Sequence, residues 1–254
     1  MLTEDPEQAR EARRLRLRLF VDLDPGMHRS GIPLADHARI LATYKAADGA
    51  LVGVHFYEGH LRQPAPAERQ AAAIPLYARL EEVLGSVPLC CGPASFEVTT
   101  SGTPALPCAL GTRALLAFDH SVGAGTTFCF DTTSRDLGLS GFRQAVHVAA
   151  TVISRPDATR ATCNAGSKAL DAAAGDPCCE VEGWPDLEAG HPSEEHLPLW
   201  VRSGEAPELG TCLLLVPRHV CPTVNLANQA VLVCEGRVRE VVPVAARGHD
   251  VLPE

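Results

Sequence analysis

Short apolar runs alternate with longer stretches of helical spacing over the first half of the chain. Residues 20–24, 51–56 and 95–100 are runs of strand length that end in turn residues, and the first run follows an alternation of Leu15, Leu17 and Leu19 with arginines. Between them, residues 34–47 and 66–84 carry apolar side chains at helical spacing. Strands that alternate with helices of this length predict a parallel α/β sheet or barrel.

The pattern changes after Phe118. Strand candidates then follow one another with turns and long polar loops between them and no convincing helix; they are residues 126–130, 145–154, 161–163, 212–216, 231–233 and 237–243. This succession predicts a mainly antiparallel β domain. We place the boundary near residues 139–143, so that an α/β domain covers residues 1–140 and a β domain covers residues 141–254.

Two potential metal ligands follow the apolar run at residues 212–216. If the extended conformation continues to Cys221, the period of two places His219 and Cys221 on one face of the strand. Imidazole and thiolate both suit zinc, whereas an Asp in place of the Cys would suit a harder ion such as manganese. A buried cysteine beside a hydrogen-bonded core histidine would produce the same spacing.

Composition narrows the classes of partner and compartment. The chain has 254 residues and a net charge of -9 without a basic run, which argues against binding to nucleic acid or to an anionic membrane surface. No apolar run approaches the length of a membrane span. The ten cysteines follow a charged N-terminal segment without the apolar core of a secretory signal, so we expect reduced thiols in the cytoplasm and a small-molecule partner.

Candidate ligand-binding residues follow the predicted parallel strands. Arg29 and Tyr57 come after the first two strands, Ser101-Gly102-Thr103 follows the third, and Gly125-Thr126 lies further along. Ligands of parallel α/β units bind at the carboxyl ends of strands, and small turns present backbone N–H groups that can hold a phosphate. Taken singly, each of these segments is commonly an ordinary turn or a surface residue.

In combination, these segments resemble a known family. Eight motifs carry the resemblance, in order from about Leu19 to Asp250: VDLDPGMHRSG, GVHFYEGH, VTTSGTP, GAGTTFCFD, NAGSKAL, PSEEH, PRHVCPTVNL and AARGHD. They are similar to motifs of the pyridoxal-phosphate enzymes with an alanine-racemase-like barrel, specifically the D-serine dehydratase and D-threonine aldolase branch. The fold that the resemblance implies is a partial (β/α) barrel of the TIM type followed by a mainly antiparallel C-terminal β domain.

The resemblance also implies roles for residues. Arg29 and Tyr57 would lie beside the ring of pyridoxal 5'-phosphate, while Ser101, Gly102, Thr103, Gly125 and Thr126 would hold its phosphate. His219 and Cys221 would bind a divalent metal, expected to be zinc, near the β-hydroxyl of a D-amino acid substrate. The His-x-Cys form is more like the zinc-dependent dehydratases, because aldolase-like members commonly have Asp at the second position. The complete enzyme is expected to be a homodimer.

Two features depart from the family pattern. The family anchors its cofactor on a lysine at the end of the first barrel strand, but this chain has only Lys45 and Lys168, and neither matches that position. Only three or four of the eight strand-helix units of a closed barrel can be counted. We therefore expect a fragment of the enzyme, or a chain whose missing half is supplied by another chain. Two rival hypotheses are a non-catalytic remnant that binds metal, cofactor or a partner chain, and a structural metal protein.

Overall fold

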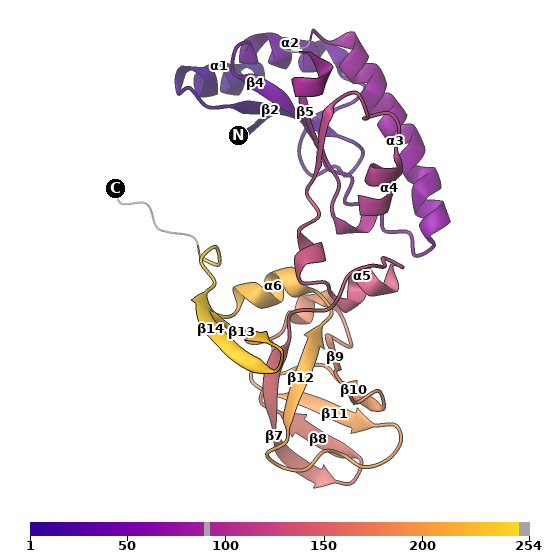
Figure 1. Cartoon of the computed structure of the whole chain (residues 1–254), viewed down its shortest axis with the longest axis vertical. Helices are drawn as coiled ribbons and strands as arrows, with labels where there is room; N and C mark the ends of the chain where they lie inside the picture. The colour runs from indigo at the N-terminus through magenta and orange to yellow at the C-terminus, as the bar shows by residue number, and fades with distance from the viewer. Residues whose placement is uncertain (89–91, 249–254) are drawn as a thin grey trace. The chain divides into compact units, whose positions relative to one another are not determined.

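The computed structural model describes residues 1–88 and 92–248, which form two compact units. Unit 1 contains Met1–Thr127 and Asp136–Leu139, and unit 2 contains Phe128–Arg135 and the chain from Ser140 onward (Figure 1). Cys90, Cys91 and the last two residues of the AARGHD motif lie outside the described residues. Within the described ranges no helix is both long and apolar enough to cross a membrane.

Unit 1 is built on a parallel sheet whose strands follow the order of the chain. The order is β1-β2-β4-β5-β6, and the strands are β1 Leu2–Thr3, β2 Leu19–Asp24, β4 Leu51–Phe56, β5 Glu97–Thr100 and β6 Asp119–Val122, with β3 Ile32–Pro33 paired to β2. All these pairs are parallel. A sheet without a reversal of strand order is the arrangement of a (β/α) barrel and differs from a doubly wound sheet.

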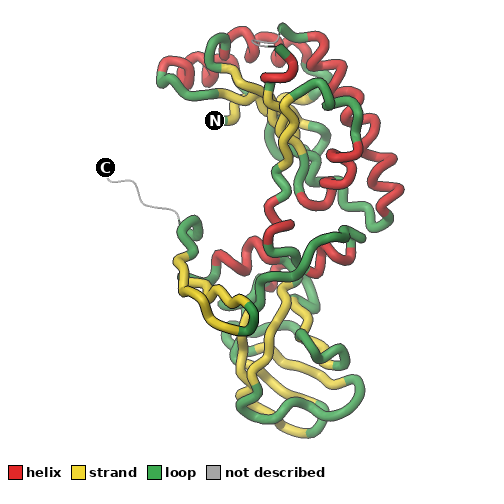
Figure 2. The backbone as a smooth tube through the Cα atoms, in the orientation of Figure 1, coloured by secondary structure: helices red, strands yellow, loops and turns green. Residues whose placement is uncertain are grey.

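Helices cover one face of this sheet, as Figure 2 shows. They are α1 Pro6–Arg14, α2 His37–Ala47, α3 Pro66–Ser86 and α4 Leu106–Gly111. Asp36 caps α2 by accepting a hydrogen bond from the Arg39 N–H, which explains why this helix begins three residues later than the predicted segment. The helices and strands enclose an apolar core that includes Val21, Val54 and Val98.

The opposite face of the sheet carries polar side chains in register. Asp22 pairs with His55, His55 with Thr99, and Thr99 with Ser121 along four neighbouring strands. The His55 Nδ1 lies 2.7 Å from the Asp22 carboxylate, and the Thr99 and Ser121 hydroxyls are 2.9 Å apart. Since successive side chains of a strand point to opposite faces, this row explains why the predicted strands are only partly apolar.

Unit 2 contains a six-stranded antiparallel sheet, as expected. The order is β10-β11-β8-β7-β12-β9, formed by β7 Val148–Asp157, β8 Arg160–Cys163, β9 Cys179–Val181, β10 Leu187–Ala189, β11 Leu197–Val201 and β12 Cys212–Pro217. A separate hairpin consists of β13 Gln229–Cys234 and β14 Arg237–Pro243. Among the described residues after residue 130, the helical elements are the short helices α5 Thr132–Asp136 and α6 Val220–Asn225 and the 3-10 turn Ala172–Ala174.

Two predicted local structures were wrong, and one strand was not predicted. Residues 126–130 do not form a strand, because Gly125–Phe128 is a 3-10 turn. The strand after Phe118 is β6, whose sequence Asp-His-Ser-Val is too polar to stand out as a core strand. The extended conformation predicted through Cys221 ends at Pro217, and helix α6 begins at Val220.

Candidate functional site

Seven predicted cofactor residues follow the carboxyl ends of four neighbouring strands in unit 1. Arg29 follows β2, Tyr57 follows β4, residues 101–103 follow β5, and residues 125–126 follow β6. The parallel pairing brings these four loops to the same edge of the sheet. This is the edge at which parallel α/β units bind ligands.

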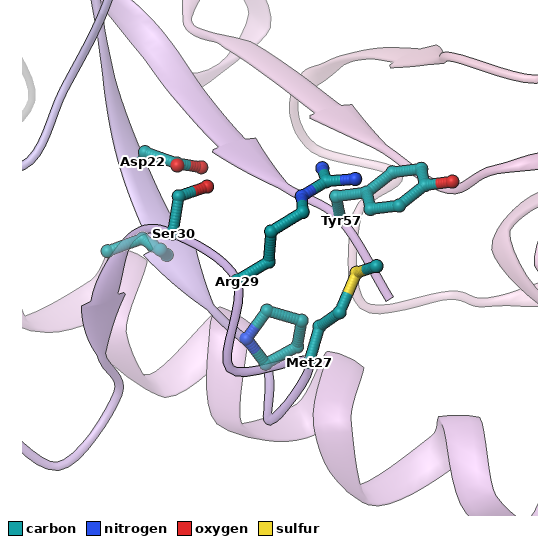
Figure 3. Close-up of a pocket in the computed structure, with 7 residues that line it drawn as sticks. Asp22, Met27, Arg29, Ser30 and Tyr57 are labelled. Carbon is teal, nitrogen blue, oxygen red and sulfur yellow. The ribbon is translucent and has the colours of Figure 1, made fainter. Parts of the chain in front are cut away.

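The loop after β2 turns sharply and returns Arg29 to Tyr57. The Asp24 carboxylate accepts hydrogen bonds from the Gly26 N–H at 2.9 Å and the His28 N–H at 3.1 Å. Burial opposes ionisation of Asp24, but these N–H groups outweigh it and hold the pKa of the carboxyl below its usual value. The Arg29 guanidinium then lies 4.6 Å from the centre of the Tyr57 ring, a cation–π contact (Figure 3).

Two glycines leave room for the Tyr57 ring. A Cβ atom at Gly59 would lie 2.3 Å from Tyr57 Cε1, and one at Gly102 would lie 2.7 Å from the Tyr57 hydroxyl oxygen. Both separations are shorter than any carbon contact can be, so these positions exclude a side chain while the ring stays in place. The ring also stacks parallel to His55, with the ring centres 6.3 Å apart. Tyr57 is thereby held between the loop after β2 and the turn after β5.

The turn after β5 contains an unpartnered buried hydroxyl. Ser101 has a positive φ of 65°, and its N–H donates to the Glu58 carboxylate at 3.1 Å. Thr103 is 4% exposed, and its Oγ1 has no hydrogen-bond partner. A buried hydroxyl without a partner is costly, so such atoms commonly mark the place of a missing ligand or water. Of the predicted phosphate residues, Thr103 carries this signal most clearly.

Glu58 binds the first N–H of this turn and was not predicted as a site residue from the sequence. Its side chain is fully buried and accepts a 2.5 Å hydrogen bond from the Tyr77 hydroxyl in addition to the Ser101 N–H. Burial raises the pKa of the Glu58 carboxyl above its usual value, although both hydrogen bonds act in the other direction. The one signal in the sequence is a carboxylate between Tyr57 and Gly59, at the end of an apolar strand.

Gly125 and Thr126 lie beside this turn. The Gly123 N–H donates to the Thr100 carbonyl at 2.9 Å, which joins the loop after β6 to the end of β5. No atom lies within 4 Å of a Cβ built at Gly125, so the space beside it is open. The cavity that Asp22, Arg29 and Tyr57 help to line is small, about 10 Å³, which leaves room for about one water molecule. A larger ligand would therefore occupy the open side of the loops.

The two predicted metal ligands lie in unit 2, near the start of α6. His219 is the N-cap residue, and Cys221 lies in the first turn of the helix. Their predicted convergence on one strand face is wrong because of this helix, although they remain two residues apart on a tight turn. The His219 Nδ1 lies 3.8 Å from the Asp171 carboxylate. Burial and, to a smaller extent, the charge of Cys221 raise the pKa of the Cys129 thiol.

The donor atoms fit a soft divalent ion, but their number is small. Over residues 1–88 and 92–248, no three His, Cys, Asp or Glu side chains converge on one possible metal position. Imidazole and thiolate are the ligand types that zinc prefers. A pair of protein ligands leaves coordination positions open for substrate or water, as a catalytic metal requires.

Neither lysine belongs to one of the four strand-end loops of unit 1. Lys45 is exposed in the last turn of α2. Lys168, in unit 2, forms ion pairs with Glu194 at 2.8 Å and Glu195 at 2.9 Å.

Comparison with known proteins points to one group of enzymes. Residues 145–233 match the family model described as putative serine dehydratase domain. A D-threonine aldolase from Arthrobacter sp. is 30% identical over 247 residues, covering 91% of this chain and 61% of the aldolase. This chain thus spans about three fifths of that relative's length.

Several solved structures have the same fold as this chain. D-threonine aldolase from Filomicrobium marinum superposes with a TM-score of 0.83 at 27% identity, covering 97% of this chain and 68% of that one. D-threo-3-hydroxyaspartate dehydratase from Delftia sp. HT23 gives a TM-score of 0.76 at 23% identity, covering 96% and 72% respectively. Alanine racemases match in fold alone. The predicted fold, a partial alanine-racemase-like barrel followed by an antiparallel β domain, is confirmed.

Proposed function

We propose, from the confirmed resemblance to the D-serine dehydratase and D-threonine aldolase branch of pyridoxal-phosphate enzymes, that this chain is part of a lyase acting on D-β-hydroxy-amino acids. The observation that carries the proposal is the arrangement at the edge of the parallel sheet. There the Arg29–Tyr57 pair lies against a turn whose Thr103 hydroxyl is buried without a partner. An aromatic face, a guanidinium and a small hydroxyl turn together suit a ring that carries a phosphate.

Pyridoxal 5'-phosphate fits these residues. The Thr103 hydroxyl would donate to a phosphate oxygen, which would satisfy a buried polar atom that has no partner in the protein. Ser101, Gly102, Gly125 and Thr126 would line the same anion, and the open space beside Gly125 admits it. Arg29 and Tyr57 would lie beside the ring. The bound cofactor supplies an electron sink for cleavage of a bond at the substrate's α or β carbon.

Glu58 would act on the phosphate turn without touching the cofactor. Its carboxylate accepts the Ser101 N–H and so holds the residue with positive φ at the start of the turn. The hydrogen bond from Tyr77 fixes the carboxylate in turn. This support keeps the Thr103 hydroxyl in place before any ligand binds, and preorganised donors bind an anion without an ordering cost.

His219 and Cys221 would bind the metal of this lyase, which we propose to be zinc. As a Lewis acid the ion would bind the substrate's β-hydroxyl oxygen, with the imidazole and thiolate as protein ligands. Asp171 lies on the Nδ1 side of the His219 ring, which leaves Nε2 as the nitrogen for the ion.

Two reactions suit the same residues. Cys221 favours a dehydratase, since the aldolase-like members commonly have Asp at this position. The 30% identity to a D-threonine aldolase favours an aldolase. D-Threonine separates the two, because dehydration gives 2-oxobutanoate and ammonia, whereas carbon–carbon cleavage gives glycine and acetaldehyde.

The alternative is a protein that binds cofactor, metal or a partner chain without turnover. It is favoured by the positions of the lysines, since Lys45 is an exposed helix residue and Lys168 is paired with two glutamates.

The test is to supply the purified chain with pyridoxal 5'-phosphate and Zn²⁺ and to assay D-threonine, D-serine and their L-enantiomers. Either product pair from the D-substrates alone supports the lyase, and identifies the reaction. Cofactor binding without products supports the non-catalytic alternative. Binding of neither cofactor nor metal rejects both.

A further inference from the structure

The turn that carries His219 and Cys221 is held by a segment almost 90 residues earlier in the chain. The Asp131 carboxylate accepts the Ser134 N–H at 2.8 Å and the Val220 N–H at 3.2 Å. Thr133 donates both its N–H, at 3.3 Å, and its hydroxyl, at 2.7 Å, to the carbonyl of Arg218. The residues on both sides of His219 are therefore tied to the start of α5.

Asp131 also takes the place of a local helix cap. His219 is the N-cap residue of α6 and has an extended backbone, yet its side chain makes no capping hydrogen bond. The first N–H of the helix, that of Val220, is instead satisfied by Asp131, which is 1% exposed. An N-cap residue usually turns its own side chain toward the helix. Because Asp131 accepts this N–H, the His219 imidazole can point elsewhere.

The His219 backbone is held from the other direction as well. Thr223 donates its hydroxyl to the His219 carbonyl at 2.8 Å, and the same hydroxyl accepts the Asp171 N–H at 3.2 Å. Asp171 in turn lies 3.8 Å from the His219 ring. With Asp131 on the helix side and Thr133 on the Arg218 side, the backbone on either side of the imidazole is fixed by buried or half-buried groups.

We propose that Asp131 is a positioning residue for the metal: it sets the separation and direction of the His219 and Cys221 donor atoms without touching the ion. The inference rests on the metal site of the proposed function. Two ligands two residues apart converge on one ion only if the intervening backbone keeps one conformation, and Asp131 binds the N–H of Val220, the residue between them.

Substitution of Asp131 by Asn tests this directly. Asn keeps the size of the side chain but has one acceptor oxygen, so its NH₂ group would face either the Ser134 or the Val220 N–H, donor against donor. Thr133→Val removes only the hydroxyl bond to Arg218, and Thr133→Ser keeps it. Asp186→Asn makes the same chemical change as Asp131→Asn at an exposed position of unit 2 and is the matched control.

The measurement is a Co²⁺ titration of the full chain, followed by the thiolate-to-cobalt charge-transfer absorption. Because the chain has ten cysteines, only the part of the band that Cys221→Ala abolishes is counted. We expect Asp131→Asn to weaken Co²⁺ binding about 10- to 100-fold, the usual effect of losing a residue that orients a ligand. Thr133→Val should weaken it less, while Thr133→Ser and Asp186→Asn should match the wild type.

Each outcome decides a separate point. If the wild type shows no band that depends on Cys221, the metal site of the proposed function is wrong and the inference falls with it. If the wild type shows the band and Asp131→Asn binds with equal affinity, the inference alone is overturned. If circular dichroism shows that Asp131→Asn does not fold, the Thr133 pair decides, and equal affinities for Thr133→Val and Thr133→Ser overturn it.

Discussion

The unpartnered hydroxyl of Thr103 leads to a prediction in which stability and cofactor binding change in opposite directions. Thr103→Val replaces the hydroxyl by a methyl group of similar size. The buried Oγ1 has no partner, so its removal relieves an unsatisfied polar atom, which costs about 1–3 kcal/mol. We expect the variant without cofactor to be more stable by up to this amount, about 2–4 °C in melting temperature for each kcal/mol.

A second buried hydroxyl provides the control. Thr43 Oγ1, on α2, is also buried without a partner, but it lies in the core of unit 1 and not in a strand-end loop. Thr43→Val should raise the melting temperature in the same way. Its affinity for pyridoxal 5'-phosphate, measured by isothermal titration calorimetry, should equal that of the wild type.

Only Thr103→Val should lose affinity for the cofactor. A hydrogen bond to a charged group contributes about 1.5–3 kcal/mol, so the dissociation constant should rise roughly 10- to 150-fold. Pyridoxal, which has no phosphate, should bind the wild type and Thr103→Val equally. The reasoning is refuted if Thr103→Val melts at a lower temperature than the wild type, or if its affinity for the phosphorylated cofactor does not change.

Three further predictions concern the neighbouring residues and the metal. Gly102→Ala should displace the Tyr57 ring and lower the affinity for the cofactor, because its Cβ would lie 2.7 Å from the Tyr57 hydroxyl oxygen. The control is Gly111→Ala, whose Cβ meets no atom within 4 Å and which should leave the affinity unchanged. Glu58→Gln should change the pH dependence of stability, because the pKa of Glu58 is raised in the folded protein. The folded state favours the protonated carboxyl, and this stabilisation is complete below the ordinary pKa of 4.5. It is lost as the pH rises through the raised pKa. The stability of the wild type relative to Glu58→Gln, from urea unfolding, should therefore fall as the pH rises from about 4, and a constant difference would contradict the burial effect. Zn²⁺ should raise the melting temperature of the wild type but not of Cys221→Ala, and an equal rise in both would remove Cys221 from the site.

Much of unit 1 could be predicted because apolar residues form short continuous runs in its strands and recur every three or four residues in its helices. Strand β4 begins and ends where its apolar run does, β2 ends with its run at Asp24, and α3 begins at the predicted Pro66. Strand β6 was missed because it has only one apolar residue in four and is not fully buried at any position. Local pattern cannot identify such a strand, which is defined by its pairing with β5.

The candidate site could be predicted only in part, for a similar reason. Motif order identified the loops, and their approach follows from parallel strand pairing. The supporting contacts are long-range: Glu58 meets the Ser101 N–H 43 residues later, and Asp131 meets the Val220 N–H 89 residues later. Near Cys221, the extended conformation was expected to continue from the apolar run at residues 212–216, whereas the first N–H of α6 is bound by Asp131, a residue that no local window contains.

The most direct test of the central claim is a calorimetric titration of the unmodified chain with pyridoxal 5'-phosphate, pyridoxal and inorganic phosphate. The Arg29–Tyr57 pair and the Thr103 turn predict that the intact cofactor binds more tightly than either part, since ring and phosphate have separate contacts. No binding of the intact cofactor, or binding no tighter than that of phosphate alone, would contradict the assignment of these residues to a pyridoxal-phosphate site.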